Sequence, residues 1–279
     1  MTSSTQISYH PSLSGRSVAR WPDNVAIAQG AGFSAMDLAL PDIAAEAPAA
    51  VRQTLEASGL RPGGVPLPVE FRRDEKTFQD DLADLPMLAR VAAEVGVHAM
   101  YRSLPASDTR PRDELGPILR RRLAACASIL REQGIGLALE VLGPLHRRRE
   151  APYEFIWRLP DCASFAQTCG PGVGVLVDSW HWHHSGGTAE DIVDLSGHIL
   201  HVHVADAPQL PAAEIRDDER VLPGEGIVDL ASFFGALALA GYDGIISPEI
   251  PGTWCESTAP VDCARRAHKA VDRLLQTLS

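Results

Sequence analysis

Residues 173–187 read VGVLVDSWHWHHSGG, and residues 197–206 read GHILHVHVAD. Each stretch begins as an apolar run and ends in side chains that bind metals or move protons. The first run leads to Asp178 and His181, and the second leads to His203 and Asp206. Strands that are apolar along their length and chemically active at their carboxyl ends are typical of a (β/α)₈ barrel. The interior of such a barrel is packed, and its active site lies at the carboxyl ends of the strands.

The rest of the chain supplies the other strands and helices of such a barrel. Apolar runs bounded by glycine or proline predict strands, and longer stretches with helical apolar spacing predict helices. The predicted strands are 7–10, 33–40, 64–71, 97–101, 135–142, 173–178, 199–203 and 244–250, and the predicted helices are 21–31, 48–58, 76–94, 112–133, 153–169, 228–240 and 259–278. This alternation predicts an α/β fold with parallel strands. We therefore predict one domain, a (β/α)₈ TIM barrel spanning residues 1–279, without internal repeats or linkers.

Composition excludes several other classes of protein. The 279 residues are 45% hydrophobic, and 25 Lys and Arg against 36 Asp and Glu give a net charge of −11. Nucleic-acid binding requires a positive face, and the longest basic run is residues 146–149, so we expect no nucleic-acid partner. No stretch is apolar enough for a membrane span, and the amino terminus lacks a secretory signal pattern. We expect a cytoplasmic protein with reduced cysteines, and a homo-oligomer is compatible with the sequence.

Four candidate metal ligands lie at the carboxyl ends of four late predicted strands: Glu140, Asp178, His203 and Glu249. In a barrel these ends are neighbours on one rim, so residues distant in sequence can surround one ion. Any one of them alone would be read as a solvated carboxylate or a packed imidazole, but four successive strand ends favour a metal site. Three carboxylates and one imidazole suit Mn²⁺ best, with Mg²⁺, Co²⁺ or Zn²⁺ as alternatives.

Neighbouring residues leave some assignments open. His201 competes with His203 as the ligand, because strand alternation places both on one face. His203 is nearer the carboxyl end, so His201 is expected one layer lower in the barrel. Trp180, Trp182 and Trp254 lie near enough to the site in sequence to stack on a sugar ring, and core packing would explain each of them equally well.

Several motifs resemble those of one known family. They are ALEVLGP (138–144), GVLVDSWHWHHSGG (174–187), HVHVADAP (201–208), DDERVLPGEGIVDL (217–230) and GYDGIISPEI (241–250). These motifs resemble the xylose-isomerase-like TIM barrels of the sugar phosphate isomerase/epimerase superfamily, most closely the inosose isomerase-type members. The resemblance covers essentially the whole chain.

The resemblance implies roles for individual residues. The four strand-end residues named above would bind one divalent metal, His181 would contact substrate, and the loop that contains Arg220 would border the site. We expect Arg220 to hold a hydroxyl, carboxylate or phosphate oxygen of the substrate. The expected site therefore comprises Glu140 and Glu249 as catalytic residues, Glu140, Asp178, His203 and Glu249 as metal ligands, and His181, Arg220, Arg102 and Trp182 as substrate-binding residues.

The sequence also departs from two branches of the superfamily. Ketohexose 3-epimerases carry an acidic residue and an arginine where this chain has His146 and Gln209, which disfavours free ketohexoses as substrates. Relatives with DNA-repair activity bind several zinc ions through many more histidines, which this chain lacks.

Metal-dependent isomerisation or epimerisation of a keto-sugar or keto-inositol is the function we expect. One glutamate would remove the proton α to a metal-bound carbonyl to give an enediolate, and the other would return a proton elsewhere. A lyase of the same superfamily begins with the same step, either a dehydroshikimate-dehydratase-like enzyme or one that eliminates from 3-keto-glycosides. A sugar-binding barrel without catalysis is the non-enzyme alternative.

Overall fold

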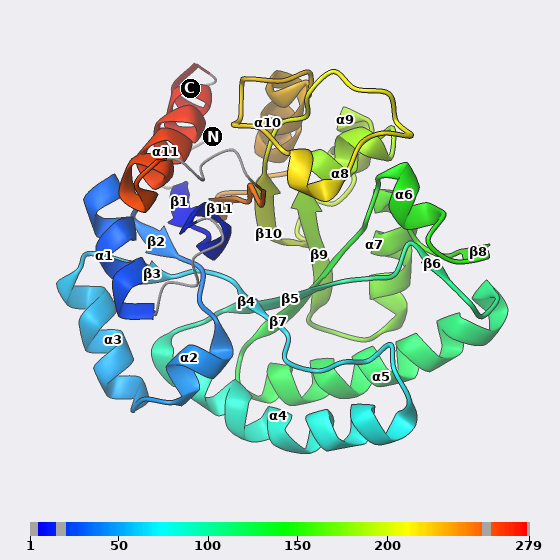
Figure 1. Cartoon of the computed structure of the whole chain (residues 1–279). Coiled ribbons are helices and arrows are strands. Elements are labelled where there is room, and N and C mark those ends of the chain that lie inside the picture. Colours follow the sequence, from blue (N-terminus) through cyan, green and yellow to red (C-terminus); the bar gives the residue numbers. More distant parts are fainter. Residues whose placement is uncertain (1–4, 15–20, 253–257, 278–279) are drawn as a thin grey trace.

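The computed structural model describes residues 5–14, 21–252 and 258–277, and its central feature is a curled parallel sheet surrounded by helices (Figure 1). Within these ranges the sheet has nine strand segments, in the order β3 (Arg61–Pro62), β2 (Ala35–Met36), β1 (Gln6–Tyr9), β11 (Ile245–Pro248), β10 (Ile199–Val204), β9 (Val173–Asp178), β7 (Gly136–Glu140), β5 (Ala99–Ser103) and β4 (Val65–Pro66). The edge segments β3 and β4 are two halves of one strand. The sheet therefore closes as an eight-stranded barrel, which confirms the predicted TIM barrel.

The interruption between β3 and β4 lies at Gly63 and Gly64, and backbone hydrogen bonds carry the barrel across it. The Gly63 N–H donates to the Met36 carbonyl over 2.7 Å, and the Leu38 N–H donates to the Gly64 carbonyl over 3.0 Å. A Cβ atom at Gly63 would lie 2.1 Å from Asp37 Oδ1. Glycine is therefore required here for the chain to pass the buried Asp37 carboxylate.

Helices cover the outside of the barrel (Figure 1). The described residues form the α-helices α1 (Trp21–Ala31), α2 (Leu40–Ala44), α3 (Pro48–Ala57), α4 (Glu75–Val95), α5 (Arg112–Glu132), α6 (Leu145–Arg148), α7 (Leu159–Thr168), α8 (Ser179–His184), α9 (Ala189–Val193), α10 (Leu230–Leu239) and α11 (Pro260–Thr277), and the 3₁₀ helices η1 (Pro11–Ser14) and η2 (Asp217–Glu219). A small antiparallel pair, β6 (Ser107–Asp108) and β8 (Tyr153–Glu154), lies apart from the barrel. No helix in the described ranges has the length and apolar character of a membrane span.

Local sequence signals explain the two longest helices. Asp74 caps α4 by accepting a hydrogen bond from the Thr77 N–H, and Gly96 ends the helix in the left-handed conformation at φ 100°. The predicted apolar stripe of α5 is buried and packs into the core at Leu115, Leu119, Leu123, Cys126 and Leu130. Their burial anchors α5 to the neighbouring strands, because removing apolar surface from water is the main favourable term in folding.

Strands β9 and β10 are formed by the two apolar runs at residues 173–178 and 199–204. Every residue of β9 is buried, as expected of a parallel strand covered on both faces. In β10, His201 and His203 share one face and lie inside the barrel, where their rings are in edge contact at 5.0 Å between centroids. Register pairs His203 with Asp178, so both residues lie at the same level of the barrel.

Three local predictions are corrected. The predicted helix 153–169 begins only at Leu159, because Tyr153–Glu154 forms β8 and Pro160 stands in the first turn of α7, where proline is favoured. The predicted strand 33–40 is reduced to β2, and α2 already begins at Leu40. Cys263 is disulfide-bonded, whereas Cys126, Cys162 and Cys169 are free thiols as predicted.

Candidate metal centre at the carboxyl ends of the strands

The structure brings the four predicted metal ligands together. Glu140 ends β7, Asp178 ends β9, His203 is the penultimate residue of β10, and Glu249 follows β11. One donor atom from each of these four residues lies within 4.8 Å of the other three. His203 Nδ1 is 3.3 Å from Glu249 Oε2 and 3.7 Å from Glu140 Oε1. This spacing is that of a group of donors around one small cation.

The hydrogen bonding of these donors fits a cation. Glu140 Oε1 and both ring nitrogens of His203 are buried and have no hydrogen-bond partner among the described residues. Buried polar atoms normally have a partner, because an unpaired one costs free energy. Oxygen and imidazole nitrogen are ligands that divalent transition metals accept. The residues present therefore fit the divalent ion that the sequence predicts.

Electrostatics at the site reflect this concentration of acidic groups. Burial lowers the pKa of His203, but the Glu249 and Glu140 carboxylates outweigh it and hold that pKa well above its ordinary value. Burial raises the pKa of Glu249, but the positive charges of Arg220 and His203 outweigh it and hold that pKa well below its ordinary value. The cluster thus favours an ionised glutamate and a cation beside it.

Arg220 supplies a positive charge within the protein. Its Nη1 donates to Asp178 Oδ2 over 2.7 Å and to Glu249 Oε2 over 3.0 Å. The guanidinium is buried and lies 5.4 Å from the centroid of the Trp180 ring. Arg220 therefore contacts two of the four candidate ligands directly.

His181 lies beside Arg220 because α8 begins directly after the candidate ligand Asp178. Asp178 caps this helix by accepting a hydrogen bond from the Trp180 N–H through Oδ1, which leaves Oδ2 facing the cluster. The Gly143 N–H donates to His181 Nδ1 over 3.3 Å, and Nε2 lies 3.2 Å from Arg220 Nη2. Both contacts come from N–H donors, and a neutral imidazole has one acceptor nitrogen, so only one of them is a hydrogen bond in a given tautomer. Either one holds His181 next to the cluster.

Two predicted substrate-binding residues lie elsewhere. Arg102 is paired with Glu70 over 2.9 Å, while its strand neighbours Tyr101 and Ser103 face His203 and Glu140. The alternation of the strand therefore points Arg102 away from the cluster. Trp182 donates through its indole N–H to the Thr188 carbonyl and packs on Phe233. Trp254 lies outside the described residues.

Sequence reasoning missed two residues that border the cluster. His10, directly after β1, has its Nε2 3.8 Å from Glu249 Oε1. Asp37, just after β2, is buried, and its Oδ2 lies 3.4 Å from His201 Nε2 and 3.9 Å from His203 Nε2. Donor atoms of His10, Asp37 and His203 also lie within 4.8 Å of one another. Their positions at the ends of early strands were the available signal.

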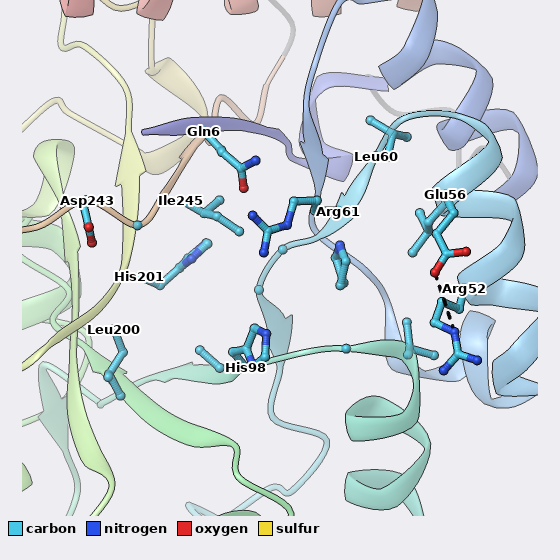
Figure 2. Close-up of a pocket in the computed structure, with 18 residues that line it drawn as sticks. Gln6, Arg52, Glu56, Leu60, Arg61, His98, Leu200, His201, Asp243 and Ile245 are labelled. Carbon is cyan, nitrogen blue, oxygen red and sulfur yellow. Dashed lines mark ion pairs between the residues drawn. The ribbon is translucent and has the colours of Figure 1, made fainter. Parts of the chain in front are cut away.

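A cavity of about 660 Å³ lies at the opposite end of the barrel (Figure 2). The starts of strands line it, and Gln6, Arg61, His98 and Ile245 lie around it in Figure 2. His201 reaches it from the barrel interior, but none of the four candidate ligands lines it. This cavity is therefore separate from the candidate metal centre.

A closed β/α barrel with buried carboxylates and an imidazole at the carboxyl ends of its strands belongs to the class of TIM barrels built for chemistry at that rim. Within that class, the chain belongs to the xylose isomerase-like TIM barrel family, whose sequence model matches residues 25–274. The predicted family is thereby confirmed.

Individual relatives agree with this family. An inosose isomerase from Bacillus velezensis is 24% identical over 182 residues, which cover 64% of this chain and 62% of the relative. A 3-dehydroshikimate dehydratase from Pseudomonas putida is 32% identical over 122 residues, which cover 43% of this chain and 18% of the relative. The chain thus spans less than two thirds of the length of these curated relatives.

Solved structures match over nearly the whole chain. A xylose isomerase domain protein from Alicyclobacillus acidocaldarius is 28% identical with a TM-score of 0.90, covering 98% of this chain and 99% of that one. The IolI protein, solved with a bound zinc atom, has the same fold, with a TM-score of 0.85 and 17% identity, covering 99% of both chains.

Proposed function

We propose that this protein is a divalent-metal-dependent isomerase or epimerase that acts on a keto-sugar or keto-inositol. The observation that carries the proposal is that Glu140 Oε1 and Glu249 Oε2 both lie near the buried Nδ1 of His203, at 3.7 Å and 3.3 Å. Inosose isomerases among the relatives support the reaction class. The expected partner is a small carbohydrate or cyclitol.

Glu140, Asp178, His203 and Glu249 would hold one divalent ion. A divalent ion at such a site polarises a carbonyl and stabilises negative charge on its oxygen. The structure does not distinguish between metals, and Mn²⁺ remains our prediction. Bound zinc in a protein of the same fold is compatible with a site of this kind.

The two glutamates are suited to opposite halves of a proton transfer. Glu249 is partly exposed, and its Oε1 faces away from Arg220, so a substrate can reach it. Glu140 is buried, and its Oε2 accepts a hydrogen bond from the Ser103 hydroxyl over 2.9 Å. One carboxylate removes the proton next to a carbonyl, and the other returns a proton to the neighbouring carbon or to the other face. Such groups typically contribute about 10²–10⁴-fold each.

Substrate oxygens would be oriented by Arg220 and His181. The Arg220 guanidinium keeps donors on its Nη2 side beside the imidazole, while its Nη1 holds Asp178 and Glu249. The pair thus offers a positive donor next to a ring nitrogen at the edge of the cluster. This suits the hydroxyl groups of a sugar or cyclitol.

A dehydratase of the same superfamily is the second candidate. The 32% identity to a 3-dehydroshikimate dehydratase favours it. A carboxylate-bearing substrate would need a free cationic group at the site, and Arg220 is already bound to two carboxylates while Arg102 is bound to Glu70. We therefore rank isomerisation or epimerisation first.

The test combines metal analysis with isotope exchange. The purified protein is analysed for metal by mass spectrometry and then incubated in D₂O with keto-inositols, keto-sugars, 3-keto-glycosides and dehydroshikimate. About one bound ion, with solvent deuterium entering a substrate carbon only when Glu140 and Glu249 are intact, is the expected result. Loss of water to form a carbon–carbon double bond would indicate the dehydratase. Binding of a sugar without exchange would indicate a non-catalytic barrel.

A further inference from the structure

His10 has no part in the proposed proton transfer, yet it lies next to two of the candidate ligands, His203 and Glu249. It follows β1, and its ring is in edge contact with His203 at 5.3 Å between centroids. Its side chain is only 13% exposed. Because the imidazole is largely buried, each of its two nitrogens is expected to have a hydrogen-bond partner.

One of these nitrogens is fixed as a hydrogen-bond acceptor. The Ser12 N–H donates to His10 Nδ1 over 3.2 Å, and Ser12 Oγ lies 2.8 Å from the same nitrogen. Ser12 Oγ itself accepts the Ile250 N–H over 3.1 Å, which leaves its own proton to donate to Nδ1. Because a neutral imidazole carries one proton, the proton of His10 is on Nε2.

The Nε2–H faces an acceptor that it does not reach. Its nearest carboxylate oxygen is Glu249 Oε1 at 3.8 Å, which is too long for a hydrogen bond. Among the described residues neither atom has another hydrogen-bond partner, since Arg220 contacts Oε2 and the backbone carbonyl of Glu249. A free donor and a free acceptor therefore stand side by side at the site.

We propose that His10 Nε2–H and Glu249 Oε1 together bind one hydroxyl group of the substrate. The hydroxyl oxygen accepts from His10, and its proton is donated to Glu249. Only a group that both donates and accepts satisfies the pair, so a hydroxyl fits and a carbonyl does not. The inference rests on the proposed function and adds to it: His10 selects a substrate that carries a hydroxyl where Glu249 acts.

Two matched variants test this role in the metal-loaded enzyme. His10→Leu removes the donor, whereas His10→Gln keeps an N–H near the position of Nε2. With the substrate identified by exchange, His10→Leu is expected to lower kcat/KM about tenfold to a hundredfold, and His10→Gln to recover most of the loss. One monodeoxy analogue of the substrate is expected to react equally with wild type and His10→Leu. Metal affinity, measured by titration, is expected to stay the same in both variants.

Three results would overturn the inference. Equal kcat/KM for wild type and His10→Leu on the active substrate refutes it while the proposed function stands. A loss that no deoxy analogue removes, and that His10→Gln does not recover, means that His10 only maintains structure. A wild type that exchanges no compound of the panel refutes the proposed function and this inference together.

A further readout depends neither on activity nor on metal. Long-range ¹H–¹⁵N correlation of the metal-free wild type is expected to show the His10 proton on Nε2. Ser12→Ala removes the hydroxyl but keeps the backbone N–H that donates to Nδ1, so Ser12→Ala and Ser12→Thr are both expected to keep the Nε2–H form. A proton on Nδ1 in the wild type would overturn the inference, whatever the variants do.

Discussion

The two ends of the barrel differ in whether their polar side chains are buried or exposed. At the carboxyl end, carboxylates and imidazoles are buried, and Glu140 Oε1 and the His203 nitrogens have no hydrogen-bond partner within the described part of the chain. At the amino end, a cavity of about 660 Å³ is lined by apolar residues and by solvated groups such as Arg61. The charged side chains that line this cavity are exposed. The candidate site is therefore marked by buried donor atoms without hydrogen-bond partners among the described residues, and this cavity does not mark it.

The reason lies in the cost of burying charge. Ionised groups withdrawn from water destabilise a protein unless partners compensate them. At the carboxyl end, Arg220 compensates Asp178 and Glu249 only in part, and the cluster remains acidic. The divalent cation that we propose for this site would supply the missing positive charge.

The largest expected effect is on the exchange rate, when the same substitution, Glu→Gln, is made at each end of the barrel. Glu249→Gln and Glu140→Gln are each expected to lower the rate of solvent-deuterium exchange by about 10²–10⁴-fold, because each removes a group that accepts the proton. Glu56→Gln, which alters the amino-end cavity, is the matched control and should keep the wild-type rate. Exchange rates followed by NMR in D₂O would decide. An equal fall in exchange rate for Glu56→Gln would contradict the assignment of the chemistry to the carboxyl end.

The second prediction compares two histidines of one strand. His203→Gln is expected to weaken metal binding by more than about 100-fold, since even residues that only orient a ligand are worth about 10–100-fold. His201 lies below it, stacked on Tyr101 and bound to Asp37 and Ser247, so His201→Gln should weaken binding less. Calorimetric titration of both variants with Mn²⁺ and Zn²⁺ measures the difference. A greater loss of metal affinity for His201→Gln than for His203→Gln would mean that the metal binds deeper in the barrel, at His201.

The meeting of the four candidate ligands could be predicted from sequence because each stands at the end of an apolar strand. Barrel topology then places such ends on one rim, whatever their separation in the chain. His10 and Asp37 follow a short and an interrupted region of sheet, where the apolar pattern was weaker. Their contacts with Glu249, His201 and His203 depend on three-dimensional packing.

Arg102 and Trp182 show the opposite limit. Both residues are close in sequence to a strand end, but the Arg102 side chain pairs with Glu70 and the Trp182 ring packs on Phe233. A shift of one residue in a strand reverses the face that a side chain occupies. The sequence therefore predicts which strands end at the site more securely than which neighbouring side chains enter it.

The third prediction concerns pH. The Glu249 and Glu140 carboxylates outweigh burial and raise the pKa of His203, so the metal-free ring holds a proton at neutral pH. A metal must displace that proton, and affinity should rise about tenfold per pH unit until the pH passes the raised pKa. In the metal-free protein the same shift contributes stability below about pH 6.5, and this contribution is lost as the pH rises through the raised value. Titrations between pH 6 and pH 8 should show this slope in wild type and none in His203→Gln.

The smallest expected effect is at the amino end. The Arg61 side chain forms no ion pair or hydrogen bond with the other described residues and is exposed beside the cavity (Figure 2), while the Arg61 backbone N–H donates to the Ser34 carbonyl over 3.0 Å. Exposed substitutions without partners usually change the free energy of unfolding by less than about 0.5 kcal/mol. Arg61→Ala should therefore leave thermal stability, metal affinity and exchange rate at wild-type values. A fall in exchange rate with unchanged stability and metal affinity would mean that the cavity communicates with the rim. His201 would then be the residue to replace next, because it lines the cavity and contacts both Asp37 and the His203 ring.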